Sequence, residues 1–529
     1  MKTARLISAA LLLITLHGMH EAEAATLRWS GQGDYLSADP HAQNEGMNNN
    51  INDLIHERLV MRDQSLKIIP ALAVSWERTS PTTWRFNLRK DVTFHDGTPF
   101  NADDVVFSIN RAQSPTSNFK TYAQMLGKVR KIDDLTVEFT TAAPNPIMME
   151  HMVAINIVSK KWMETNGVTA PQDFKTGQET FASRRANGTG PYMLVSRESE
   201  VKTVLKANPS WWGRKAGLFT GNAEEVIYRP IKSDATRMAA LLSGEIDFVL
   251  DPPLQDLERL KRNGNIKVVE GPENRVLFLV FDQHSDELKY SSVKGKNPFK
   301  DLRVRQAMYH AIDVEAIRTQ VMRGQSRVTG AMVPAAVSSD PALEPRLLPV
   351  NAERARALLK EAGYPNGFDV DLLCPNNRYV NDERICTAIS AMLSKVGIRT
   401  KLTLQPRAQF FQRVDNFDFS FHLYGWGGAP TDPGLTLSPV LSQNDRKGRG
   451  DFNSGRFKDA ELDALIGRIE TEMDIAKRRT MMLEALQRVR QQIYTLPLHR
   501  QVIPWAMRKN VTVVHRADNV LQPIWVSVI

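Results

Sequence analysis

The second half of the chain alternates strand patterns with helix patterns, and this alternation limits the fold more than any other feature. Residues 351–363 have the pattern of a helix that ends at a glycine, and FDVDLLC at 368–374 has that of a strand. An amphipathic helix pattern at 382–396 stops at Gly397, and the strand pattern IRTKLTL follows. Strands that alternate with helices of this length form βαβ units with parallel neighbours. The sequence therefore predicts an α/β fold.

The most distinctive single stretch runs from residue 70 to residue 111. WRFNL at 84–88 alternates apolar and polar side chains, as a strand with one wet face does, and residues 92–94 fit a second strand. An HDGT turn follows. Asn101 then precedes Asp104 by three residues, which is close to a capping box, so a helix is expected to start there and run to Arg111.

This stretch carries a resemblance to a known family. The order LAxSWE, an alternating strand, then LRxxVxFHDGTPxxAxDVxxS is similar to the signature of the family 5 extracytoplasmic solute-binding proteins, whose members include dipeptide- and oligopeptide-binding proteins of ABC importers. Further segments resemble the same family, namely GTGPY at 188–192, NPSWWG at 208–213, SGEID at 243–247 and NPFKDLRVRQA at 297–307. The resemblance implies a two-lobed periplasmic binding protein of the Venus-flytrap, type II-like kind, with an extra subdomain in the first lobe.

The family's domain order can be carried onto this chain. The resemblance implies a first lobe of residues 25–272 plus 498–529, with an inserted subdomain at about 61–187, and a second lobe of residues 273–497. The boundary is expected near Gly271 and Pro272, just before the apolar strand pattern NRVLFLVFD. Two crossings of the chain between the lobes would then serve as a hinge.

Residues 1–24 have the features of an export signal. Lys2 and Arg5 precede an apolar core at 6–16 that is too short to span a bilayer, and Ala22-Glu23-Ala24 fits the A-x-A cleavage rule. Cleavage is expected between Ala24 and Ala25, which predicts a periplasmic protein. Because Ala25, and not a Cys, directly follows the cleavage point, a lipid anchor is not expected.

Composition argues against a nucleic-acid partner. The 529 residues carry a net charge of +9, but 68 Lys and Arg are scattered among 59 Asp and Glu without a long basic run. We interpret the charge as favouring solubility and anionic partners. Gly31 and Gly33 lack the third glycine of a dinucleotide motif, since Leu36 stands in its place. We expect no cofactor, no metal site and a monomer.

The two cysteines favour a disulfide. Cys374 follows a predicted strand, Cys386 lies near a helix start, and an exported chain meets an oxidising compartment. The alternative is two separate reduced thiols. Two thiols without nearby paired His make a zinc site a poor interpretation.

The resemblance also points to ligand-binding residues. In open α/β sheets ligands bind beyond the carboxyl ends of strands, which makes Gly33 and Tyr35, in the loop after the first strand pattern, candidates for the cleft wall. In dipeptide-binding relatives an arginine at what we align with Arg378 holds the carboxylate of the ligand. A surface Arg in a loop is the alternative.

A second candidate segment follows the strand pattern at 415–424. Here the family places Gly-Trp followed by an acid that pairs with the α-amino group of a peptide, so Trp426 and Gly427 are candidates. Ala429 stands where this acid aligns, and the nearest carboxylate is Asp432. Either Asp432 binds the ammonium group or the ligand lacks one. Peptides are the leading ligand class; opines, glycosides and nickel or haem chelates are alternatives.

An enzyme, such as a periplasmic peptidase or amidase, is disfavoured. The segment at 324–328 lacks the second glycine of GxSxG, and His56-Glu57 is followed by Val60 where HExxH needs its second His. Trp211 and Trp212 fit a core better than a ligand platform, and His422 fits a strand better than a metal site. We therefore predict no catalytic residues and a binding function, in which an ABC permease and its ATPase receive the solute.

Overall fold

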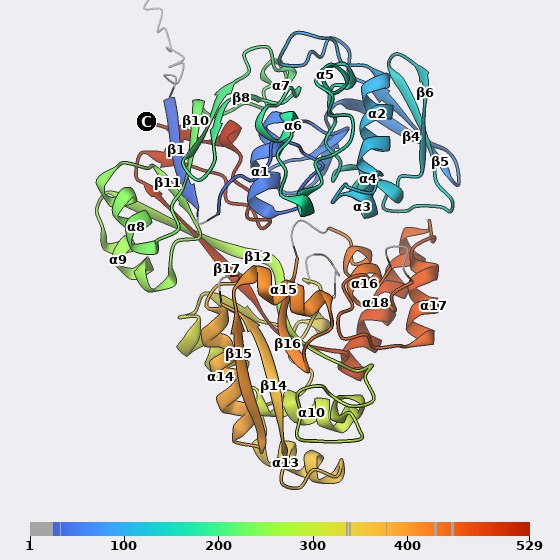
Figure 1. Ribbon diagram of the computed structural model, residues 1–529, viewed down its shortest axis with the longest axis vertical. Helices are drawn as coiled ribbons and strands as arrows, with labels where there is room; N and C mark the ends of the chain where they lie inside the picture. Colours follow the sequence, from blue (N-terminus) through green and yellow to red (C-terminus); the bar gives the residue numbers. More distant parts are fainter. Residues whose placement is uncertain are drawn as a thin grey trace, which may run out of the picture.

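The computed structural model of the protein describes residues 25–529, apart from residues 32, 335, 336, 338, 339, 377, 428–430 and 446–448. The chain forms two bodies, one above the other in Figure 1, joined by the long strands β12 (Ile266–Phe281) and β17 (Thr495–Arg508). One sheet runs through both bodies in the order β15-β14-β16-β12-β17-β11-β1-β10-β9-β8. The fold is a mixed α/β fold with two lobes.

The first lobe holds the part of this sheet beyond β17. Strand β1 pairs in parallel with both β10 and β11, whereas β9 runs antiparallel to its neighbours. The elements of this part are β1 (Ala25–Gly31), α1 (Gly46–Ile55), β8 (Tyr192–Glu198), β9 (Lys202–Ala207), α7 (Trp212–Lys215), β10 (Ala223–Pro230), α8 (Asp234–Ser243), β11 (Phe248–Leu250), α9 (Leu257–Arg262), β18 (Val511–Thr512) and β19 (Ser527–Val528).

A subdomain with its own four-stranded antiparallel sheet, in the order β4-β5-β7-β6, lies beside this part. Helix α2 starts with the predicted capping box of Asn101 and Asp104, which is confirmed. The elements are β2 (Val60–Arg62), β3 (Ile68–Pro70), β4 (Ala73–Ser80), β5 (Thr83–Leu88), α2 (Ala102–Ala112), α3 (Lys120–Gln124), β6 (Lys128–Asp133), β7 (Thr136–Thr140), α4 (Met148–Met152), α5 (Lys160–Thr165) and α6 (Phe181–Arg184).

The second lobe contains the predicted βαβ unit. Strand β14 pairs in parallel with β15 and β16, because helix α14 connects β14 to β15 across one face of the sheet. The elements are α10 (Leu302–Ala311), α11 (Val314–Ala316), β13 (Ser326–Val328), α13 (Ala352–Glu361), β14 (Phe368–Pro375), α14 (Asp382–Ser394), β15 (Ile398–Gln405), α15 (Arg407–Asp415), β16 (Phe421–Trp426), α16 (Gly434–Val440), α17 (Ala460–Ile469) and α18 (Ile475–Gln492).

The connection between the lobes is a pair of antiparallel strands. Strand β12 pairs with β17 from Ile266 to Val280, and the ladder is interrupted only at residues 273–275 and by a shift after Leu277. Gly271 and Pro272, near which the sequence predicts the boundary between the lobes, lie inside β12. The pairing of β12 with β17 breaks directly after Pro272, which has no N–H to donate.

The sheet of the first lobe is mixed, because β9 runs antiparallel to β8 and β17 runs antiparallel to β11.

One local expectation needs correction. Residues 92–94, which fit a strand by their sequence, form only an isolated bridge between Thr93 and Pro99. The HDGT turn reverses the chain too soon for a second strand to extend.

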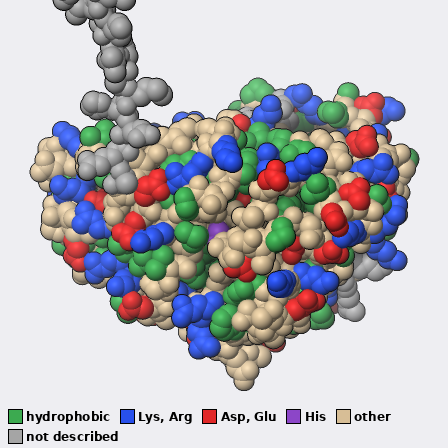
Figure 2. Space-filling view, turned by 90° about the horizontal axis from the view of Figure 1, so that it is seen from above, with side chains coloured by type: hydrophobic (Ala, Val, Ile, Leu, Met, Phe, Trp, Pro, Cys, Tyr) green, Lys and Arg blue, Asp and Glu red, His purple; other side chains and the backbone are tan. Residues whose placement is uncertain are grey.

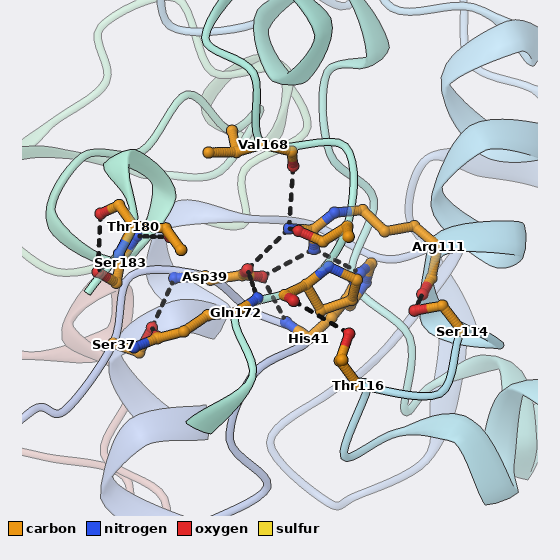
Figure 3. A network of polar contacts seen from close by, with 12 residues as sticks. Ser37, Asp39, His41, Arg111, Ser114, Thr116, Val168, Gln172, Thr180 and Ser183 are labelled. Carbon is orange, nitrogen blue, oxygen red and sulfur yellow. Dashed lines mark hydrogen bonds and ion pairs between the residues drawn. The ribbon is translucent and has the colours of Figure 1, made fainter. Parts of the chain in front are cut away.

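A buried ion pair ties the subdomain to the loop after β1. Arg111 of α2 donates to both carboxylate oxygens of Asp39, at 2.8 and 2.7 Å, and both side chains are almost fully buried (Figure 3). Arg111 also lies 3.1 Å from Nδ1 of His41, whose Nε2 lies 2.8 Å from the carbonyl oxygen of Asn156. Burial, followed by the charge of Arg111, lowers the pKa of His41 to about 4, so a neutral imidazole completes the network.

The surface mixes charges of both signs. Figure 2 shows Lys and Arg side chains interspersed with Asp and Glu over the face seen from above. Within the described residues, no helix is long and apolar enough to cross a membrane.

Candidate functional site

Arg378 lies in the loop between β14 and α14. The backbone N–H groups of Arg378 and Tyr379 donate to Oδ2 of Asp382 at 2.8 and 3.0 Å, which holds the loop against the first turn of α14. The guanidinium carbon of Arg378 lies 5.0 Å from the centre of the Tyr379 ring. A planar guanidinium held beside a ring is suited to a carboxylate, which it can bind with two parallel hydrogen bonds.

A disulfide bond joins the two elements that flank the Arg378 loop. Cys374 near the end of β14 and Cys386 in α14 are bonded, with their Cα atoms 6.6 Å apart, and both are fully buried. The structure therefore contains the expected bridge. It ties the strand before Arg378 to the helix after it, so the two ends of the loop are fixed relative to each other.

Glu273 and Arg275 form a second charged group, in the gap of the β12–β17 ladder. Nε of Arg275 donates to Glu273 at 3.0 Å, and Nε2 of Gln501 on β17 donates to the other carboxylate oxygen at 3.0 Å. Burial acts to lower the pKa of Arg275, but Glu273 and Tyr379 outweigh it, so the pKa is raised. Arg275 is thus a permanent cation near the Arg378 loop. No periodic sequence pattern points to either residue, although Gly271-Pro272 before them indicates an irregular strand.

Trp426 and Gly427 lie at the end of β16, next to Arg275. Nε1 of Trp426 donates to the carbonyl oxygen of Leu435 at 3.2 Å, and its ring centre lies 4.8 Å from that of Phe452. A Cβ atom at Gly427 would lie 2.3 Å from Cα of Arg275. Glycine is therefore required here by the close approach of two backbones, and Arg378, Trp426 and Gly427 belong to one region.

Asp432 forms an ion pair with another side chain of the second lobe. Its carboxylate forms an ion pair with Arg478 of α18, which includes an Nη2–Oδ1 bond of 2.8 Å, and Oδ1 also accepts from the N–H of Gly434 at 2.7 Å. These contacts neutralise the charge that a ligand ammonium group would need. Ala429, where the family's acid aligns, lies outside the described residues.

The loop before α16 also contacts the first lobe. Oγ1 of Thr431 donates to Oε1 of Glu150, and Nη2 of Arg62 binds the other carboxylate oxygen at 2.6 Å. Arg62 and Glu150 belong to the subdomain, so this contact joins the two lobes at one side of the molecule.

Gly33 and Tyr35 differ in their surroundings. Gly33 is exposed beyond the end of β1, and its carbonyl oxygen accepts from the hydroxyl group of Tyr228. Tyr35 has an exposed fraction of 0%, and its hydroxyl group donates to Asn52 at 2.6 Å. The expectation for Tyr35 is corrected: its ring packs into the first lobe and offers a solute no contact surface in this conformation. Loop position alone could not distinguish an inward ring from an outward one.

Asp251, which no sequence motif marks, follows the short strand β11. This strand pairs in parallel with β1, with Val249 opposite Ser30, so Asp251 and Gly33 lie at the same carboxyl edge of the sheet. Nδ2 of Asn519 lies 3.1 Å from each carboxylate oxygen of Asp251. Burial, followed by the charge of Glu273, raises the pKa of Asp251 to about 6.

Trp211, Trp212 and His422 make contacts within the fold. Trp211 and Trp212 both donate from Nε1 to Oε1 of Glu57, at 3.0 and 2.8 Å, between the subdomain and the rest of the first lobe. His422 is fully buried in β16, 2.9 Å from Oγ of Ser454. Among the described residues, no group of three or more His, Cys, Asp or Glu side chains could hold a metal ion.

Comparison with known proteins decides the family. The family model described as "Bacterial extracellular solute-binding proteins, family 5 Middle" matches residues 67–448, which is more than half of the chain. The chain belongs to this family. It is 29% identical to heme-binding protein A of Haemophilus influenzae over 78% of this chain and 75% of that protein. It is 25% identical to the dipeptide-binding protein of Escherichia coli K12, over 84% of this chain and 83% of that protein.

A solved structure gives the same fold for this family 5 protein. The periplasmic binding protein DppA of Helicobacter pylori, in complex with the peptide STSA, superposes with a TM-score of 0.81 at 23% identity, over 95% of this chain and 98% of that one. The predicted two-lobed binding-protein fold is therefore confirmed. The relatives named here are solute-binding proteins and not enzymes, and the family is extracytoplasmic.

Proposed function

We propose that this family 5 protein captures di- or oligopeptides in the periplasm and delivers them to an ABC permease and its ATPase in the inner membrane. The observation that carries the peptide assignment is Arg378, whose loop is fixed at both ends by the disulfide and by Asp382. A guanidinium in this position can bind the terminal carboxylate of a peptide. The dipeptide-binding relative supports the same ligand class.

The binding step follows from the connection between the lobes. Residues 25–272 with 498–529 act as one lobe and residues 273–497 as the other, and the break in the β12–β17 ladder at 273–275 lies at the proposed hinge. A solute that contacts both lobes stabilises the closed state by its differential affinity for that state. The mature protein begins near Ala25 and acts as a monomer. No catalytic step is required.

Arg378→Ala tests the assignment. The variant should lose about tenfold to a hundredfold in affinity for a peptide with a free carboxyl terminus, since a hydrogen-bonded charge contributes roughly 1.5–3 kcal/mol. The same peptide with an amidated carboxyl terminus should bind both proteins equally weakly. Arg384→Ala, an exposed position in α14, is the matched control. Equal affinity of the parent protein for both peptides would remove Arg378 from the site.

Native mass spectrometry of the protein purified from its own periplasm identifies the solute directly. The expected additional mass fragments into amino acids. If the bound compound is a haem or another non-peptide, the binding function stands and the peptide assignment is withdrawn. Ala429 and the ion pair of Asp432 with Arg478 favour this alternative, because they leave no acid at the family's ammonium position.

A further inference from the structure

Asp251 is an exposed carboxylate at the end of a strand in the first lobe. It lies at the carboxyl edge shared by β1 and β11, which is where ligands bind in α/β sheets. Desolvation by the surrounding protein, followed by the charge of Glu273, also raises the pKa of Asp251 to about 6.

The charges around Asp251 leave it without a counter-ion. Glu273 and Arg275 on β12 pair with each other at 3.0 Å, and Arg237 on α8 pairs with Asp234 at 2.6 Å. Asn519, from the segment after β17, contributes a neutral amide. Within the described part of the chain, no Lys or Arg forms an ion pair with Asp251. A carboxylate accepts about four hydrogen bonds, so capacity for a cationic donor remains.

Hydrogen bonds connect the surroundings of Asp251 to the Arg378 loop. The segment 517–519 contacts Asp251 through Asn519, and the carbonyl oxygen of Ala517 accepts from the N–H of Asn274 at 3.0 Å. Gln501 donates to Glu273, beside Asn274, and accepts from the N–H of Val380 in the Arg378 loop at 3.3 Å. An acid on the first lobe and a cation on the second lobe therefore lie at the two ends of one network. A solute with an ammonium group at one end and a carboxylate at the other matches this order of charges.

We infer that Asp251 binds the ammonium group of a zwitterionic peptide, in place of the acid that the family pattern expects where Ala429 stands. The assignment rests on the proposed peptide function and makes Asp251 a specificity-determining residue. The carboxylate belongs to the first lobe, whereas the segment around residue 429 belongs to the second. An ammonium ion on Asp251 and a carboxylate on Arg378 would therefore bridge the two lobes.

The test uses di-, tri- and tetra-alanine, each with a free or an acetylated amino terminus, in calorimetric titrations of the full mature protein. The parent protein should prefer the free amine by about tenfold or more. Asp251→Asn should lose this preference but keep its discrimination between free and amidated carboxyl termini. The asparagine oxygen can still accept from Asn519, so the fold should persist, which thermal unfolding checks. Asp256→Asn, whose acid pairs with exposed Arg259, is the control for the change of charge.

Proton release gives a readout that a purely structural role would not affect. An ammonium group lowers the pKa of the carboxylate that binds it, so at pH 6 each free-amine peptide should release roughly half a proton from Asp251. Titrations in buffers of different ionisation enthalpy measure this number. Acetylated peptides and Asp251→Asn should show no such release. The affinity of the parent protein should fall as the pH decreases through about 6.

The outcomes separate the two claims. A preference for free amines that survives in Asp251→Asn would retain the peptide function and overturn the role of Asp251. Equal binding of free and acetylated peptides by the parent protein would do the same. Binding of none of the peptides would overturn both.

Discussion

Glu57 shows how a single buried carboxyl group connects parts of the first lobe. Its Oε1 accepts from the two indole N–H groups of Trp211 and Trp212, and Arg89 lies 3.7 Å from the centre of the Trp212 ring. Burial raises the pKa of Glu57 from 4.5 to about 7. The folded protein therefore holds a proton that the unfolded chain releases over this range.

The sign of the pH effect follows from this proton. Because the folded state binds more protons than the unfolded state between pH 4.5 and about 7, Glu57 lowers the free energy of unfolding as the pH rises through this window. Relative to Glu57→Gln, the parent protein should lose on the order of 3 kcal/mol across it. Urea unfolding at several pH values measures the difference, with exposed Glu198→Gln as the control. A constant difference would mean that Glu57 is ionised in the folded state.

At this scale the sequence offers some candidate residues and does not point to others. Arg378 is a candidate because a strand pattern ends before it, a helix pattern begins after it, and an arginine of dipeptide-binding relatives aligns with it. Asp251 and Arg275 were not selected because their positions depend on a three-residue strand and on a break in a ladder. Neither feature has a periodicity that a single sequence reveals. Tyr35 was misplaced because the direction of a loop side chain depends on tertiary packing.

Among the secondary-structure elements, β14 and α14 are joined most directly, through the Cys374–Cys386 bond. The bond closes a segment of 12 residues in sequence separation. Removing it with Cys374→Ser and Cys386→Ser together should lower the free energy of unfolding by about 3 kcal/mol, according to the loop-entropy estimate. Because the segment contains Arg378, affinity for free-carboxylate peptides should also decrease. Denaturation with and without reductant measures the first effect, and reductant should leave the double variant unchanged.

Element types were easier to predict than element pairing. The capping box of α2 and the βαβ unit of β14, α14 and β15 follow from local signals and from apolar spacing. The position of β17 between β11 and β12 does not, because that strand pairs with partners more than 200 residues earlier in the sequence. Only the family resemblance suggested its return.

At the scale of the whole molecule, Thr431 and Glu150 test whether contacts between lobes hold a solute in place. Glu150→Ala removes the acceptor of Thr431 and the partner of Arg62. We expect faster release of peptide by about twofold to fivefold, since a partly exposed polar contact contributes up to about 1 kcal/mol. Stopped-flow tryptophan fluorescence measures the rate. Glu164→Ala, which removes an exposed pair with Lys160, should leave the rate unchanged.

The late return of β17 also has a consequence for the order of folding. This strand contacts β11, β12 and β13, so it completes the sheet of both lobes, yet every other strand of that sheet precedes it in the sequence. During synthesis, neither lobe can close its central sheet before residues 495–508 emerge from the ribosome. The growing chain therefore stays incompletely folded until late, which suits a member of an extracytoplasmic family.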